Sequence, residues 1–317
     1  MSILEAVHPS VERDTVEGFE AVTLAAGSLE ATFVPSLGMV GASLRHAGEE
    51  LLDRRAGLRA YRATGAVMGV PLLHPWANRL ARDELIVAGH RMRLPGPPAV
   101  WRDEHGLPIH GLLGAHPGWS VHEADADGHA ARLIARLDFA ADPRLLAVFP
   151  FPHELVLEAT LSVRSLRIAT TVRAAGATAV PIAFGYHPYL RVPGVSRADW
   201  RVRMPARRHL ELDELAIPTG RGTWESAVDF RLGGAGFDDG YDSIDEGAVF
   251  SVAGGGREIR VSFDAGFPAA QVFSPPGAPF ICFEPMTAPT NALCTGVGLR
   301  WVAPGDAFTA VFTIAVS

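Results

Sequence analysis

Lysine is absent from the 317-residue sequence, so all 28 basic side chains are arginines. A Schiff-base mechanism, a pyridoxal-phosphate anchor and a phosphate-binding P-loop each depend on a lysine amine. The sequence therefore excludes these three kinds of chemistry. The formal net charge of −7 also argues against nucleic acid or an anionic membrane as the main partner, because both attract basic surfaces.

Cysteine and long apolar runs are scarce too. The two cysteines, Cys282 and Cys294, fit neither a CxxC nor a zinc-finger spacing, and they predict reduced thiols in a cytosolic protein. No apolar run approaches the roughly 18 residues that cross a membrane. Residues 1–8 lack the basic start and apolar stretch of a secretory signal. We therefore expect a cytoplasmic protein with no membrane partner.

Glycine and proline are abundant, whereas aromatic residues make up only 8% of the chain. The 33 glycines and 24 prolines favour many strands joined by turns over long helices. About half of the residues are apolar, which allows a sizeable core and excludes a disordered, collagenous or coiled-coil chain. The length fits one large domain or two modest ones. Because no linker or internal repeat interrupts the sequence, we expect a single domain over residues 1–317.

Alternation of apolar and polar side chains recurs along the chain. It predicts strands with one buried face in four segments, residues 131–139, 166–173, 258–264 and 308–316. The glycines of residues 254–256 predict a hairpin turn, and residues 95–98 predict a loop. No segment of twelve or more residues keeps a helical period. The sequence therefore predicts an all-β chain of antiparallel strands, either a large sandwich or a jelly roll.

Familiar catalytic motifs are missing from the sequence. No GxSxG, HExxH or GxGxxG motif is present. His105, His110 and His116 are separated by five and six residues, which matches neither the i, i+4 spacing of helical ligands nor the i, i+2 spacing of strand ligands. We therefore expect neither a metal site nor a bound cofactor.

What remains is a set of polar side chains at turns or strand ends inside apolar sequence. The candidate site residues among them are Asn78, Arg79, His110, His187, Asp238 and Glu284. Glu284 closes an apolar strand and precedes a proline, where a carboxylate is costly unless it is paired or used. Singly, each residue has an ordinary structural interpretation, such as an Asx turn for Asp238 or a backbone-bonded histidine for His187.

The order of these residues along the chain carries a family resemblance. The motifs are Asn78-Arg79, His110-Gly111, His187-x-Tyr189, Asp238-x-x-Tyr241, Glu284-x5-Thr290-Asn291 and the closing Leu299-Arg300-Trp301-Val302-Ala303-Pro304-Gly305-Asp306. Together they resemble the aldose 1-epimerase (galactose mutarotase-like) family over roughly residues 20–317. The ordered set is more specific than any one of its short members.

The resemblance implies a large antiparallel β-supersandwich with a sugar cleft on one face and no cofactor. It implies that His187 is the general acid and Glu284 the general base. It also implies that Arg79 holds the sugar and the developing charge. The remaining implied roles are hydroxyl binding by His110 and Asp238 and support of this set by Asn78.

The implied reaction suits these side chains. Interconversion of the α and β anomers of an aldohexose opens the ring at the anomeric carbon and recloses it on the other face. A base takes the C1-hydroxyl proton while an acid protonates the ring oxygen, and the two groups swap roles on the return. Carboxyl and imidazole groups, with ordinary pKa values of about 4.3 and 6.5, can do this near neutral pH.

The neighbours of the implied acid and base differ from those of the best-known galactose mutarotases. Those proteins resemble N-H-x-Y-F-N at the acid, E-T-Q after the base and H-G-G at the hydroxyl-binding histidine. Here the runs are Tyr186-His187-Pro188-Tyr189-Leu190-Arg191, Glu284-Pro285-Met286-Thr287 and His110-Gly111-Leu112. The acid and base stay in place, but galactose is not assumed as the sugar.

Three alternatives stay open at this point. A hexose-6-phosphate 1-epimerase would need extra cations, for which the candidates are Arg201, Arg203, Arg207, Arg208, Arg82 and Arg91. Arginines on the solvent face of a strand also have an ordinary structural interpretation. A non-catalytic carbohydrate-binding protein would not need both His187 and Glu284, and a structural all-β domain would need none of the polar groups. The expected partner is a small-molecule sugar, and the expected oligomeric state is a monomer or a homodimer.

Overall fold

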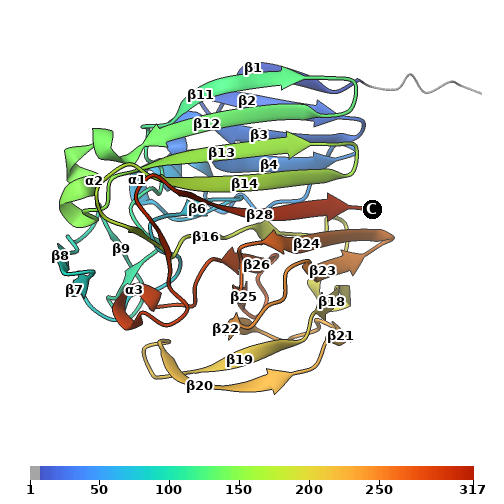
Figure 1. Ribbon diagram of the computed structural model, residues 1–317. Helices are drawn as coiled ribbons and strands as arrows, with labels where there is room; N and C mark the ends of the chain where they lie inside the picture. The colour runs from blue at the N-terminus through green and yellow to red at the C-terminus, as the bar shows by residue number, and fades with distance from the viewer. Residues whose placement is uncertain (1–7) are drawn as a thin grey trace, which may run out of the picture.

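Antiparallel strands dominate the computed structural model, which describes residues 8–317 (Figure 1). The largest sheet has nine strands, in the spatial order β11 (Ser120–Ala126), β12 (Ala131–Asp138), β13 (His153–Leu161), β14 (Ser165–Ala174), β28 (Ala307–Val316), β24 (Arg257–Ala265), β23 (Ala248–Gly254), β18 (Arg201–Met204) and β21 (Val228–Arg231). All four segments with alternating sequence lie in this sheet, as β12, β14, β24 and β28. The alternation prediction is therefore confirmed.

The second sheet has eight strands and carries three of the six candidate site residues, His187, Asp238 and Glu284. Its spatial order is β20 (Pro218–Glu225), β19 (Arg207–Leu212), β22 (Phe237–Asp242), β25 (Ala269–Ser274), β26 (Ile281–Met286), β16 (Gly185–Tyr186) and β6 (Leu72–Leu73), with β17 (Tyr189–Leu190) also paired to β26. In Figure 1, β22, β25 and β26 lie below β28 and to the left of β18 and β21, and β19 and β20 form the lower rim.

The other strands form one five-stranded sheet and three short ladders. The five-stranded sheet comprises β1 (Ser10–Val16), β2 (Phe19–Ala26), β3 (Leu29–Val34), β4 (Val40–His46) and β5 (Glu49–Glu50). It packs against β11, β12 and β13, as the upper part of Figure 1 shows. The ladders pair β7 (Glu84–Val87) with β8 (His90–Arg93), β9 (Trp101–Arg102) with β10 (Pro108–Ile109), and β15 (Val180–Ile182) with β27 (Arg300–Val302).

Helices are few and short, as the sequence predicts. They are α1 (Gly57–Thr64), α2 (Pro143–Val148) and α3 (Ala292–Thr295), with 3-10 turns at Pro35–Leu37, Phe139–Ala141 and Arg197–Asp199. Within residues 8–317, none of these helices has the length and apolar character needed to cross a membrane. Residues 1–7, on which the expected lack of a secretory signal largely rests, lie outside the described residues.

Burial follows the predicted period of two. On β12 the side chains of Leu133 and Leu137 are buried, whereas Arg136 between them is exposed. The predicted hairpin turn at residues 254–256 joins β23 to β24, where Gly254 pairs with Arg257. Its two central glycines have φ values of +59° and +83°, the left-handed values that a tight two-residue hairpin requires.

The fold is therefore an all-β antiparallel supersandwich rather than a jelly roll. The nine-stranded and five-stranded sheets enclose the main apolar core, and the eight-stranded sheet continues that core on its inner face. Both cysteines are free, with Cys282 buried and Cys294 half-buried.

Candidate active site

One cavity of about 450 Å³ collects every candidate site residue that the sequence singles out. Its lining includes Asn78, Arg79, His110, His187, Asp238 and Glu284. They come from three regions of the fold, namely the segment after β6, the end of β10 and the eight-stranded sheet. A cavity of this size lies within the range of small-molecule sites in proteins, roughly 300–1,000 Å³.

His187 and Glu284 face each other because of strand register. Gly185 of β16 pairs with Met286 of β26, and Tyr189 of β17 pairs with Cys282 of the same strand. Continuing this antiparallel register through the break between β16 and β17 places His187 opposite Glu284. Their side chains approach to 3.2 Å between Nε2 and Oε1, with only 6% and 1% of their surfaces exposed.

The strand that carries Glu284 is longer than the sequence predicts. The sequence predicts that Glu284 closes the strand, but β26 continues through Pro285 to Met286. The proline is tolerated because β16 and β17 are interrupted opposite residues 283–285, so no partner on that side requires its missing N–H. The same interruption opens the sheet where the His187 side chain enters the cavity.

The facing polar atoms of this pair have no hydrogen-bond partner among residues 8–317. Although Nε2 and Oε1 are close, they are not aligned as a hydrogen bond, and both oxygens of Glu284 and Nδ1 of His187 are buried without one. Nδ1 of His110 is also buried without a hydrogen-bond partner. The ring of His110 meets the ring of His187 edge-on, with 5.5 Å between the ring centroids. Buried polar atoms normally have partners, so these cavity-lining groups are suited to a polar ligand.

Burial sets the protonation of the pair. It lowers the pKa of His187 well below its ordinary value, with a further contribution from nearby His110. Burial raises the pKa of Glu284 well above its ordinary value, assisted by Asp238 and opposed by Arg79. Both directions favour a neutral pair, in which one proton resides on Glu284 and the imidazole of His187 is uncharged.

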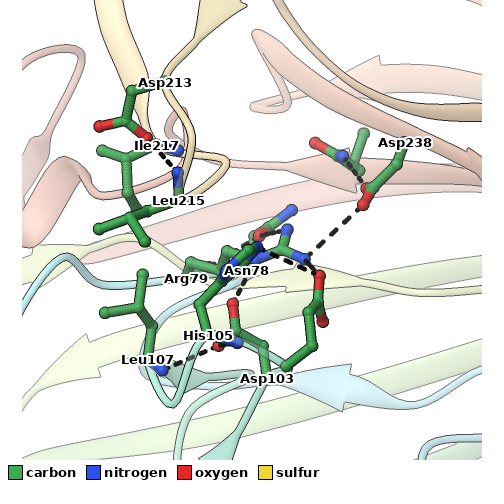
Figure 2. A network of polar contacts seen from close by, with 11 residues as sticks. Asn78, Arg79, Asp103, His105, Leu107, Asp213, Leu215, Ile217 and Asp238 are labelled. Atoms are coloured by element: carbon green, nitrogen blue, oxygen red, sulfur yellow. Dashed lines mark hydrogen bonds and ion pairs between the residues drawn. The ribbon is translucent and has the colours of Figure 1, made fainter.

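Asn78 and Arg79 enter the cavity from a strained turn after β6, where Asn78 has a φ of +57°. The Arg79 guanidinium binds Asp103 Oδ2 through Nε at 2.6 Å. Its Nη2 lies 3.2 Å from Glu104 and 3.6 Å from Asp238, and its Nη1 donates to Asn78 Oδ1 at 3.3 Å (Figure 2). Burial opposes its charge, but these carboxylates outweigh burial and raise the pKa of Arg79 above its ordinary value.

His110 also occupies a left-handed turn, with a φ of +66°. Gly111 after it has a φ of +75°, and a Cβ there would lie 2.2 Å from the carbonyl oxygen of His74. Backbone packing therefore requires the glycine of the His110-Gly111 motif. Burial, with Arg79 nearby, lowers the pKa of His110 to about 3, so its ring is neutral.

The cavity is also lined by polar residues that the sequence does not single out, namely Arg55, Arg102, Asp103, Glu104 and Gln271. Gln271 of β25 is buried beside Glu284 in the sheet register and donates from Nε2 to Asp238 Oδ1 at 2.7 Å. Its position as the sole glutamine of the chain, in the apolar segment AAQVFS, was a usable signal. Asp103 lies in a hairpin loop whose sequence does not reveal its contact with Arg79.

The three histidines considered for a metal site are not gathered. His110 lines the cavity, whereas His116 lies 3.4 Å from Asp142 and His105 lies 3.6 Å from Glu104. Across residues 8–317, no group of three or more histidine, cysteine, aspartate or glutamate side chains is arranged to hold a metal ion.

The arginines considered as phosphate ligands lie away from the cavity. None of the six is among the residues that line it. Arg201 and Arg203 bind Asp229, and Arg208 binds Asp242. Arg207 binds Glu225, whereas Arg82 and Arg91 are exposed. The Arg201–Arg208 cluster is therefore a set of carboxylate-paired side chains rather than a wall of this cavity.

Comparison with solved structures defines the class of fold. A galactose mutarotase-like protein from Clostridium acetobutylicum aligns with a TM-score of 0.83 at 18% identity, covering 98% of this chain and 99% of that one. The galactose 1-epimerase of Lactobacillus acidophilus aligns with a TM-score of 0.75 at 15% identity, covering 96% of each chain. The chain has the galactose mutarotase-like fold.

Sequence comparison then gives the family. The aldose 1-epimerase family model matches residues 20–313, and the chain belongs to this family. Among curated proteins, the Escherichia coli protein YihR, described as uncharacterized, is 25% identical over 309 residues, covering 93% of this chain and 92% of YihR.

Proposed function

We propose that the protein interconverts the α and β anomers of a free aldohexose by acid–base ring opening and closure. The observation that carries the proposal is the 3.2 Å approach of His187 Nε2 and Glu284 Oε1 at the wall of the cavity. The C1-hydroxyl oxygen and the ring oxygen of an aldose are both bonded to the anomeric carbon. A base and an acid one hydrogen-bond length apart can therefore reach both oxygens at once.

The ring opens when Glu284 takes the C1-hydroxyl proton and His187 protonates the ring oxygen. The bond between C1 and the ring oxygen breaks, and an aldehyde forms at C1. Rotation about the bond between C1 and C2 presents the other face of that aldehyde. The former ring oxygen, now a hydroxyl, then attacks C1 while His187 removes its proton. Glu284 returns its proton to the aldehyde oxygen, which becomes the new C1 hydroxyl.

The pair needs only one shared proton for this cycle. In the neutral form favoured by burial, that proton lies on Glu284. Its transfer to His187 gives the carboxylate and imidazolium that begin ring opening. Arg79 favours this transfer because its positive charge opposes the rise in the Glu284 pKa.

The other lining residues bind and orient the sugar. The Arg79 guanidinium faces the negative charge that develops on the C1 oxygen as its proton leaves. Asp238, held by Gln271, accepts hydrogen bonds from sugar hydroxyls, and neutral His110 donates or accepts one. Asn78 supports Arg79 through its side-chain oxygen.

Polarimetry tests the proposal. Freshly dissolved α-glucose, α-galactose and further α-aldoses are followed with and without the protein, and at least one should reach its equilibrium rotation faster than the spontaneous rate. Binding of the same sugars by calorimetry without any acceleration would instead identify a non-catalytic carbohydrate-binding protein. If no sugar of the panel were turned over and none were bound, both functions would be contradicted.

Hexose 6-phosphates are a second candidate substrate class because one arginine at the cavity has no ion pair within residues 8–317. Arg55 lines the cavity and lies over the rings of Phe280 at 4.7 Å and Tyr189 at 5.6 Å. An exposed guanidinium fixed in this way can bind a phosphate. If phosphorylated hexoses are preferred, Arg55→Ala should raise their KM about tenfold and leave that of free hexoses unchanged. An equal effect on both would remove the phosphate role.

A further inference from the structure

Two hairpin loops of this chain share one sequence pattern and one backbone conformation. Residues 103–108 read DEHGLP between β9 and β10, and residues 213–218 read DELAIP from the end of β19 into β20. In each loop the backbone N–H of the first residue donates to the carbonyl of the fifth, at 3.0 Å and 2.9 Å respectively, and the fourth residue has a positive φ. The loops form a natural matched pair.

The aspartate that opens each loop holds it with one carboxylate oxygen. Oδ1 of Asp103 accepts the N–H groups of the third and fifth residues of its loop, at 3.0 Å and 2.8 Å. Oδ1 of Asp213 accepts the equivalent N–H groups at 2.9 Å and 3.0 Å. Figure 2 shows both arrangements. One oxygen therefore suffices to close a loop of this kind.

The second oxygen of Asp103 has a partner outside its loop. Oδ2 accepts from Nε of Arg79 at 2.6 Å, in a contact where the side chains of Arg79 and Asp103 are 7% and 2% exposed. Within residues 8–317, the hydrogen bonds of the Asp213 carboxylate are confined to its own loop. Asp213 thus has the loop-closing role alone, whereas Asp103 combines that role with an ion pair to Arg79, which lines the cavity.

The other contacts of Arg79 do not fix the plane of its guanidinium. The Nη2 atom is 3.6 Å from Asp238 and 3.2 Å from Glu104, whose side chain is 66% exposed. The bond from Nη1 to Asn78 is 3.3 Å long. Only the contact of Nε with Asp103 is both short and buried, and it does not occupy either of the two terminal nitrogens.

We propose that Asp103 is the positioning residue for Arg79, with Oδ1 closing the hairpin loop and Oδ2 aligning the guanidinium toward the sugar. Both oxygens are engaged by the protein, so Asp103 acts through Arg79 rather than by touching the sugar. The kinetic consequence rests on the proposed function, whereas the alignment of Arg79 does not.

Kinetics of matched variants test the role. In Asp103→Asn the side-chain oxygen still accepts the two loop N–H groups, but the amide places a donor against Arg79 Nε. We expect kcat for mutarotation to fall by about 10- to 100-fold with a smaller change in KM, the order of loss that a misplacement near 1 Å causes. In Asp213→Asn we expect kcat within twofold of wild type. Equal and small effects of the two substitutions on kcat would overturn the proposal.

A double-mutant cycle separates positioning from general structure. If Asp103 acts through Arg79, then adding D103N to an Arg79→Ala background should change kcat less than twofold. If the double variant lost kcat by the product of the two single losses, Asp103 would act independently of Arg79. Should D103N unfold, Asp103→Ser, whose hydroxyl can close the loop but cannot reach Arg79, replaces it in the same cycle.

A third measurement needs no substrate. The Nε–H proton of Arg79, assigned by NMR through its loss in R79A, should exchange slowly with solvent in wild type and in D213N, and rapidly in D103N. Slow exchange in all three would overturn the positioning role. If the wild type turns over no sugar but this exchange pattern holds, the positioning role stands and the proposed function fails.

Discussion

Replacing Glu284 by glutamine is the sharpest perturbation that this site allows. The amide keeps the shape of a side chain that is 1% exposed, so packing is preserved, but it cannot accept the C1-hydroxyl proton. General acid–base catalysis contributes about 10²- to 10⁴-fold in rate, equivalent to roughly 2.7–5.4 kcal/mol at 1.36 kcal/mol per decade. We expect kcat of E284Q to fall by at least two orders of magnitude.

The assay is polarimetry of a freshly dissolved α-aldose that the wild type accepts, with the spontaneous rate subtracted. Glu158→Gln on β13 is the matched control, because its carboxylate pairs with Arg132 and does not line the cavity. E158Q should keep the wild-type rate. A rate of E284Q within about threefold of wild type would refute the role of Glu284 as the base.

The same variant tests the protonation argument through stability. Burial raises the folded-state pKa of Glu284 well above its ordinary value of about 4.3. A raised folded pKa means that the contribution of this group to stability is complete below about pH 4.3 and is lost as pH rises through the folded value. Relative to E284Q, the wild type should therefore lose stability on going from pH 4 toward neutral pH. Parallel unfolding profiles for the two proteins would contradict the raised pKa.

Two further predictions concern His187, the proposed acid, and Gly111 in the turn that carries His110. His187→Asn should lower kcat at least about 100-fold while sugar affinity changes only a few-fold; calorimetry checks the affinity, and a matching loss in both quantities would indicate positioning instead. Gly111→Ala should lower the free energy of unfolding by more than the about 1–3 kcal/mol of a left-handed alanine, because its Cβ would also meet His74. Gly194→Ala is the control, because Gly194 has a φ of +74° and open space around it. Denaturant titration measures the free energy of unfolding, and equal losses in the two variants would show that the contact with His74 adds nothing.

The sequence predicts the strands well where one face is buried and the other is exposed to solvent. Leu133 and Leu137 on β12 follow the period of two because each faces the core while Arg136 faces solvent. The prediction was less accurate for β26, where all six residues are buried and no alternation marks the ends. That strand continues past Pro285 to Met286, where it pairs with β16 and β25, and this pairing is known only from the tertiary structure.

The sequence singles out six residues that line one cavity, but not the residues that support them. His187 and Glu284 stand out as polar groups in apolar sequence, and the structure brings them together through strand register. Asp103 does not stand out, because its loop is equally well explained by turn formation, as Asp213 demonstrates. The arginine pair Arg207 and Arg208 shows that charge density along the sequence does not indicate which surface the side chains line, because both arginines pair with carboxylates outside the cavity.

The central place of β28 in the nine-stranded sheet has a consequence for biosynthesis. This strand lies between β14 and β24 and is translated after both. Until it emerges from the ribosome, the two neighbours have bare edges that can pair with other nascent chains. Joining distant segments so late also favours slow folding. Cells that make this protein in quantity would thus benefit from chaperones that shield those edges until β28 has emerged.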